Sequence, residues 1–206
     1  LVYPGVDSTF SIRDPVEIEA FRQRQQLPER YILHVGTLQP RKNIPTLLEA
    51  FARLDQSDTV LVLVGGKGWF YDEIEAKVRS LDLAERVHFT GYVADSDLPL
   101  WYNAAAVLVF PSEYEGFGMP IAQAMACGTP VIAANTSAVP EVSGEAARLF
   151  DPHDVATLTE QIAIVLDDLK VATEMRDEGF LQARKFTWKQ AGRDMVAVYH
   201  RALNKT

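Results

Sequence analysis

Five short apolar runs recur along the chain. They are separated by segments in which apolar residues have the spacing of a helix. The runs are Tyr31 to Gly36, Val60 to Val64, Val87 to Thr90, Ala106 to Phe110 and Val131 to Ala133. Apolar runs of this length without alternation are typical of strands that are buried on both faces. Because helical segments lie between them, the pattern predicts a parallel sheet with helices on both faces, which is an α/β fold.

The helical segments are recognised by apolar residues at every third or fourth position. The pattern is clearest after Asn43, a good helix cap, where Ile44, Leu47, Leu48 and Phe51 follow one another at this spacing. Further helices are expected over residues 15–26, around Ile74 and Val78, from Asp95 or Ser96 to Trp101, from Gly116 onward, and over 154–169, 171–185 and 187–206. We therefore expect a Rossmann-like domain.

The segment after Asn135 is rich in turns, and only one further strand is indicated there, at Arg148 to Phe150. Thr187 and Gln190 have the spacing of a capping box, which would begin the last helix.

Length and charge narrow the class of protein. The 206 residues suit one domain, and 48% of them are hydrophobic, which is enough for a sizeable core. The net charge of −8 argues against a nucleic-acid surface, although a local basic pocket is compatible with it. Cys127 is the single cysteine, which excludes an intrachain disulfide, and we interpret it as a buried structural thiol. The chain begins at Leu1 without a methionine, so we expect it to be part of a longer protein.

The stretch FPSEYEGFGMPIAQAMACGTP, residues 110–130, carries the strongest chemical signal. It follows a strand and opens a helix whose first turn is expected to hold Gly116, Phe117, Gly118 and the following Met119 and Pro120. Backbone N–H groups at a helix start bind anions such as phosphate, and glycines let a ligand approach closely. Glu115 would repel a phosphate, so its carboxylate is better suited to hydroxyl groups. Together these features predict a site for a sugar phosphate.

Two other strand ends carry candidate residues. Arg41 and Lys42 follow the first strand, where a ligand is expected in a parallel sheet, and they are candidates for binding phosphate. The sequence Gly65-Gly66-Lys67-Gly68 follows the second strand, but it lacks the spacing of a Walker loop or a dinucleotide fingerprint. We interpret it as a tight turn beside the cleft.

The stretch SEYEGFGMPIAQAMACGTPVIA resembles the signature of family 4 (group 1) of the retaining glycosyltransferases, in which two glutamates are separated by seven residues. The resemblance implies that Glu115 contacts the hydroxyls of the donor sugar. The second position is Gln123, which departs from the pattern and would contact the ribose without charge assistance. The family also implies that Lys42 and Arg41 bind the donor pyrophosphate.

The remaining candidates also come from this resemblance, and all of them would bind the donor. The loop FTGYV resembles the loop that holds the nucleobase in this family. The resemblance implies that Tyr92 and Val93 contact the nucleobase of the donor. Gly36 and Thr37 lie at the end of the first strand, beside the expected pyrophosphate. Phosphate would bind the N–H groups around Gly116, Phe117, Gly118 and Met119.

The family resemblance covers nearly the whole chain and implies the C-terminal, nucleotide-sugar-binding half of a GT-B glycosyltransferase. We expect residues 187–206 to cross to an N-terminal domain that binds a glycan or lipid-linked acceptor and carries a catalytic histidine. The donor would be a GDP- or UDP-sugar of mannose or glucose, used without a metal or other cofactor. The loop GTLQPRKN resembles bacterial enzymes of polysaccharide biosynthesis. We therefore expect a cytoplasmic protein, with the whole enzyme in peripheral contact with the inner membrane face.

The sequence admits several other interpretations. Asp95 and Asp97 have the spacing of a metal-binding pair, but we interpret them as helix caps. The four histidines do not cluster, which argues against a zinc site. A nucleotide-sugar epimerase would need a base-and-acid pair, and none is visible. A non-catalytic nucleotide-binding module remains open because of Gln123.

Overall fold

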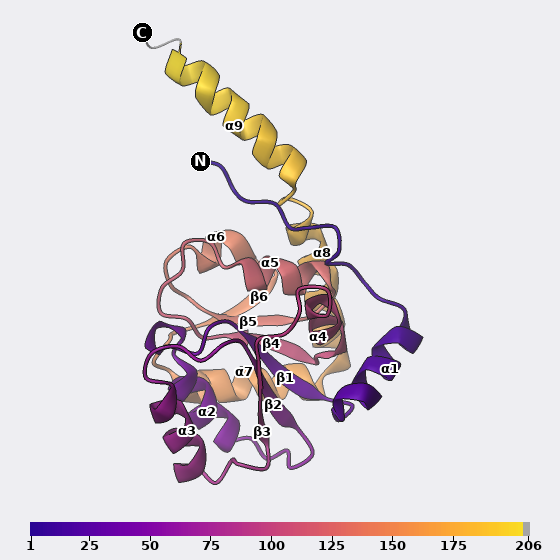
Figure 1. The fold of residues 1–206 in the computed structure, drawn as a ribbon, viewed down its shortest axis with the longest axis vertical. Helices are drawn as coiled ribbons and strands as arrows, with labels where there is room; N and C mark the ends of the chain where they lie inside the picture. The colour runs from indigo at the N-terminus through magenta and orange to yellow at the C-terminus, as the bar shows by residue number, and fades with distance from the viewer. Residues whose placement is uncertain (204–206) are drawn as a thin grey trace.

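The structure, a computed structural model, describes residues 1–203. In this range six strands form one parallel sheet in the order β3-β2-β1-β4-β5-β6 (Figure 1). The strands are β1 (Tyr31–Val35), β2 (Val60–Val64), β3 (Val87–Gly91), β4 (Val107–Phe110), β5 (Val131–Ala134) and β6 (Ala147–Phe150). The predicted α/β class and all the predicted strands are confirmed, including the short strand at the end of the sheet.

Helices alternate with the strands, as the apolar spacing predicts. They are α1 (Pro15–Gln25), the 3-10 helix η1 (Pro40–Lys42), α2 (Ile44–Ala52), α3 (Tyr71–Ser80), α4 (Leu98–Ala104), α5 (Met119–Ala126), α6 (Val139–Ser143), α7 (Val155–Asp167), α8 (Leu169–Ala183) and α9 (Trp188–Leu203).

The sheet separates two apolar cores. One core joins α2, α3 and α7 to one face of the sheet, and Leu47, Ile74 and Ile162 are among its buried residues. The other core joins α1, α4 and α5 to the opposite face, where Phe21 and Trp101 are buried. Burial of apolar area on this scale is the main favourable term in folding, because each fully buried large side chain contributes about 1.5 to 3 kcal/mol.

The starts of α5 and α4 differ from the prediction. Helix α5 begins at Met119, because Gly118 has a left-handed φ of 96° that a helix cannot include. Gly116 and Phe117 therefore lie in the preceding loop and not in the first turn. Helix α4 begins after Asp97, whose side chain makes no capping hydrogen bond.

Asp97 stands at the N-cap position of α4, as predicted, whereas Asp95 lies outside it. The side chains of both aspartates have other partners. The hydroxyl of Tyr92 donates a hydrogen bond to Asp95 Oδ1 at 3.1 Å. Asp97 lies 3.9 Å from Arg24 at the end of α1, in an exposed ion pair.

Helix α9 projects away from the rest of the domain, and none of its described residues is buried (Figure 1). The hydroxyl of Thr187 accepts a hydrogen bond from the N–H of Gln190, which confirms half of the predicted capping box. The side chain of Gln190 donates a hydrogen bond to Asp194 and not to the backbone of Thr187, so the second hydrogen bond of the capping box does not form. Residues 204–206 of the predicted helix lie outside the described residues. No described helix combines the length and the apolar character needed to cross a membrane.

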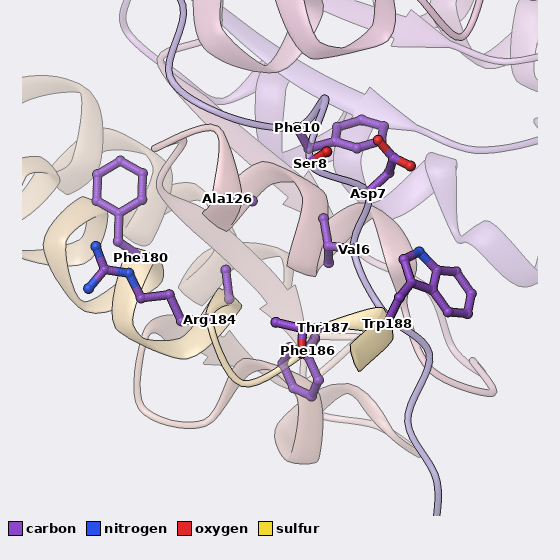
Figure 2. A pocket seen from close by; sticks show the side chains of 11 residues that line it. Val6, Asp7, Ser8, Phe10, Ala126, Phe180, Arg184, Phe186, Thr187 and Trp188 are labelled. Atoms are coloured by element: carbon purple, nitrogen blue, oxygen red, sulfur yellow. The ribbon is translucent and has the colours of Figure 1, made fainter. Parts of the chain in front are cut away.

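The N-terminal segment packs against the junction between α8 and α9. The N–H of Val6 donates to the carbonyl of Phe186 at 2.9 Å. A side chain at Gly5 would clash with the backbone of Trp188, since a Cβ there would lie 2.2 Å from its nitrogen. Figure 2 shows the groove beside this contact, about 580 Å³ in volume, with Val6 and Trp188 on its wall. Two segments far apart in sequence thus meet at one place.

Cys127 lies directly after α5 and is buried, as predicted. Burial raises the pKa of its thiol to about 12, so the residue stays protonated at neutral pH. This environment is that of a packing residue.

Candidate functional site at the switch point of the sheet

The candidate site lies where the chain reverses its direction of travel across the sheet. Strands β1 and β4 are neighbours, and the chain leaves them toward opposite edges, to β2 and to β5. In such sheets the loops beyond the carboxyl ends of these two strands diverge and leave room for a ligand. The loop after β1 carries Arg41 and Lys42, and the loop after β4 carries Glu115.

The structure brings these three side chains together. Lys42 Nζ donates a hydrogen bond to Glu115 Oε1 at 2.6 Å, and Arg41 Nη1 lies 2.9 Å from the same oxygen. The side chains of Lys42 and Glu115 are only 8% and 12% exposed, whereas that of Arg41 is 42% exposed. The two cations therefore share one oxygen of the carboxylate, Oε1.

The charges of the site favour an anionic ligand. Burial raises the pKa of Glu115, but the hydrogen bond and the positive charge of Lys42 outweigh it, with a contribution from Arg41, and the pKa is below its usual range. The carboxylate is thus ionised at neutral pH. Two cations and one carboxylate leave a local charge of +1 in a chain whose net charge is −8. A phosphate would be attracted here in spite of the acidic surface.

Backbone contacts fix the two loops relative to each other. Arg41 Nη1 donates to the carbonyl of Tyr114 at 2.5 Å, and the N–H of Glu113 donates to the carbonyl of Arg41 at 3.0 Å. The N–H of Glu115 donates to Ser137 Oγ at 2.9 Å, which connects the site to the loop after β5. No sequence signal indicates Ser137, because serines are common in turn-rich segments. It is the order of the strands that brings this residue to the site.

The backbone before α5 presents free donors. Among the described residues, no protein acceptor pairs with the N–H groups of Phe117, Gly118 or Met119. The ring of Phe117 is held by two others, with centroids 5.9 Å away for Tyr3 and 5.2 Å away for Phe186. This cluster fixes the loop that carries the donors and links it to the junction with α9.

Gly36 and Thr37 lie at the end of β1, on the same edge of the sheet. The N–H of Gly36 donates to the carbonyl of Val64, and the side chain of Thr37 is exposed. A Cβ at Gly36 would lie 3.3 Å from Lys42 Nζ, so this glycine leaves the space in which the lysine rests.

No hydrogen bond or ion pair within the described range joins three of the predicted residues to this cluster. Tyr92 is exposed at the end of β3, the edge strand, and Val93 lines a separate pocket of about 310 Å³. Gln123 lies on α5, where its Oε1 accepts a hydrogen bond from the buried hydroxyl of Tyr102 at 3.0 Å. A ligand that contacted Tyr92 and Glu115 together would have to span the ends of β3, β2, β1 and β4.

No group of His, Cys, Asp and Glu side chains within residues 1–203 is arranged to hold a metal ion.

Fold and site together define a Rossmann-like α/β domain with an anion-attracting site at its switch point. The family described as group 1 glycosyl transferases matches residues 16–182. The chain belongs to this glycosyltransferase family, as its sequence motifs indicate.

Individual relatives agree with this assignment. O-antigen chain mannosyltransferase B of Escherichia coli is 37% identical over 196 residues, which cover 93% of this chain and 51% of that protein. Among solved structures, the sucrose-phosphate synthase of Thermosynechococcus elongatus superposes with a TM-score of 0.87 at 30% identity, over 98% of this chain and 52% of that one. HepE of Anabaena, solved with UDP-glucose, superposes with a TM-score of 0.86 at 23% identity. The match covers 95% of this chain and 57% of HepE, and it shows a likeness of fold alone. The chain spans about half the length of these proteins.

Proposed function

We propose that the chain is the nucleotide-sugar-binding half of a retaining glycosyltransferase, which transfers mannose or glucose from a nucleoside diphosphate sugar to a glycan or lipid-linked acceptor. The observation that carries the proposal is the cluster of Lys42, Arg41 and Glu115 at the switch point. It combines cations for a diphosphate with a carboxylate for sugar hydroxyls. The name of one relative supports mannose, since it is a mannosyltransferase, and glucose remains the alternative sugar.

In this proposal each group has a separate role in transfer. Lys42 and Arg41 offset the charge that develops on the diphosphate as the bond to the sugar breaks, a form of electrostatic stabilisation. The N–H groups of Phe117, Gly118 and Met119 contribute fixed donors to the same phosphates. Glu115 accepts hydrogen bonds from the sugar and so orients it. The leaving diphosphate is stabilised by protein groups, and no metal is assigned a role.

The first test is a calorimetric titration of the chain with GDP, UDP and ADP. We expect one of them to bind, and we expect Lys42→Ala to lower its affinity at least about tenfold, because a hydrogen bond to a charged group contributes roughly 1.5 to 3 kcal/mol. Lys170→Ala is the control, since Lys170 is exposed on α8. Equal affinity of the Lys42→Ala variant and the parent chain would contradict the placement of the diphosphate.

Helix α9 is assigned a role in the whole protein. Trp188, Met195 and Tyr199 form an exposed apolar stripe on it, spaced at seven and four residues. We propose that this stripe packs against an N-terminal half that binds the acceptor, because the chain spans only about half of its relatives and the stripe is without a cover in the described residues.

Replacing Tyr199 with aspartate tests this contact. The unfolding free energy of the chain should change by less than about 0.5 kcal/mol, because the side chain is exposed. Transfer by the whole protein should fall, whereas Arg193→Asp, on the other side of the helix, should leave transfer unchanged. If both variants transferred sugar at the rate of the parent protein, α9 would have no role in the contact.

A second candidate function is a nucleotide-binding module without transfer. It is favoured by one observation, that the side chain of Gln123 is a neutral amide whose carbonyl oxygen already accepts one hydrogen bond, from Tyr102, so that it offers a ribose a weaker acceptor than a free carboxylate would. Intact nucleotide binding with no transfer by the whole protein would favour this module over the transferase.

A further inference from the structure

His34 is an unassigned residue directly beneath the candidate site. It lies in β1 with no exposed surface, and its ring stacks on Phe110 at a centroid distance of 6.3 Å. Lys42 Nζ lies 4.9 Å from the centroid of the same Phe110 ring. One aromatic ring is thus shared by the buried imidazole and the ammonium group of the site.

The protonation of the His34 ring follows from its contacts. Nδ1 lies 3.2 Å from the carbonyl oxygen of Val109, and a carbonyl oxygen only accepts, so Nδ1 carries a proton. Burial lowers the pKa of His34 to about 4, and the charge of Lys42 also lowers it. The ring is neutral at physiological pH, and Nε2 is therefore a lone-pair acceptor.

Nε2 faces the same space as the Lys42 ammonium. It is buried, and no hydrogen-bond donor pairs with it in the described part of the chain. A Cβ placed on Gly36 would lie 3.5 Å from His34 Nε2 and 3.3 Å from Lys42 Nζ, so both groups border the space beside this glycine. An acceptor left without a donor in the interior would cost about 1 to 3 kcal/mol. An ammonium group has three N–H donors, and the structure uses one of them, on Glu115.

We propose that His34 is a positioning residue for Lys42: one water molecule accepts a hydrogen bond from the Lys42 ammonium and donates one to His34 Nε2. Glu115 then holds the ammonium from the side of the cleft and His34 holds it from the interior. The lysine is fixed at the strand end before a ligand arrives, which lowers the entropy cost of binding an anion. The role toward a diphosphate rests on the proposed function, whereas the contact itself does not.

The contact is tested without any nucleotide, by NMR of the chain with ¹⁵N-labelled histidine. We expect the His34 ring in the Nδ1–H tautomer from pH 6 to 8, assigned by the signals that His34→Phe removes. We also expect Lys42→Met to shift its Nε2 resonance, and Lys170→Met to leave it in place. An Nε2–H tautomer would overturn the proposal, and so would an Nε2 resonance whose chemical shift Lys42→Met does not change.

The effect on binding is tested with the nucleoside diphosphate that binds the chain. His34→Phe should lower the affinity for this diphosphate by about three- to tenfold. The affinity for the corresponding nucleoside, which has no phosphate, should not change. His34→Gln, which keeps an acceptor, should restore part of the affinity. His200→Phe, at an exposed position on α9, is the control and should have no effect.

A double-mutant cycle completes the test. In a Lys42→Met background His34→Phe should cause no further loss, because the group that it positions is gone. Equal losses in both backgrounds would show that His34 acts independently of Lys42 and would overturn the proposal. If Lys42→Met alone did not change nucleotide affinity, the proposed function would fail, while the NMR result would still decide the contact.

Discussion

Replacing Glu115 with glutamine should lower sugar transfer by the whole protein about a hundredfold and leave nucleoside diphosphate affinity unchanged or higher. The carboxylate repels phosphate, so its neutralisation removes a repulsion and frees Lys42 and Arg41 to face the diphosphate. The same change weakens the acceptor for the sugar hydroxyls, and hydrogen bonds to a charged group are about twice as strong as neutral ones. Binding of the sugar nucleotide should therefore weaken relative to that of the diphosphate.

Transfer by the whole protein and calorimetric affinities for the two ligands measure this effect. Glu113→Gln is a matched control, because Glu113 is an exposed carboxylate on the same loop. If Glu115→Gln and Glu115→Ala both kept full transfer and full affinity for the sugar nucleotide, Glu115 would not contact the sugar.

Replacing Gly65 with alanine should lower the free energy of unfolding by about 3 kcal/mol or more, and the melting temperature by roughly 6 to 12 °C. Gly65 follows β2 with a φ of 149°, and a Cβ there would lie 2.0 Å from the carbonyl oxygen of Gly36. Both partners are backbone, so relief requires β1 and β2 to separate at the end that carries the site. Urea denaturation of the parent and variant chains measures the loss.

The neighbouring glycine is the control for this change. A Cβ at Gly66 would have no atom within 4 Å, so Gly66→Ala should change stability by less than about 0.5 kcal/mol. Similar stabilities for the Gly65→Ala and Gly66→Ala variants would show that the two strand ends are not held as tightly as this contact requires.

The sheet could be predicted because buried parallel strands leave an unbroken apolar run, as from Val60 to Val64. The starts of α4 and α5 could not be predicted to the residue. Gly118 is in a left-handed conformation set by the packing of its loop, and Asp97 is paired with Arg24, a residue far away in sequence. Both features are decided by tertiary contacts that the local sequence does not contain.

The parts of the site that the sequence reveals are those at strand ends. Arg41, Lys42 and Glu115 were candidates because they follow strands, and the order of the strands then brings them into contact. No sequence pattern singles out His34, because a histidine inside a strand looks like any other core residue. Only the free Nε2 beside Gly36 indicates otherwise. Its relation to Lys42 depends on the orientation of a ring, which no sequence pattern encodes.

The buried thiol of Cys127 makes this chain a convenient background for site-specific labelling. With a pKa of about 12 and no access to reagents, the one native cysteine will not compete for a maleimide dye. A second cysteine introduced on the exposed surface of α9 would then be the sole reactive position. Fluorescence from that label could follow how the protruding helix moves as a ligand enters the cleft, without first removing any residue of the natural sequence.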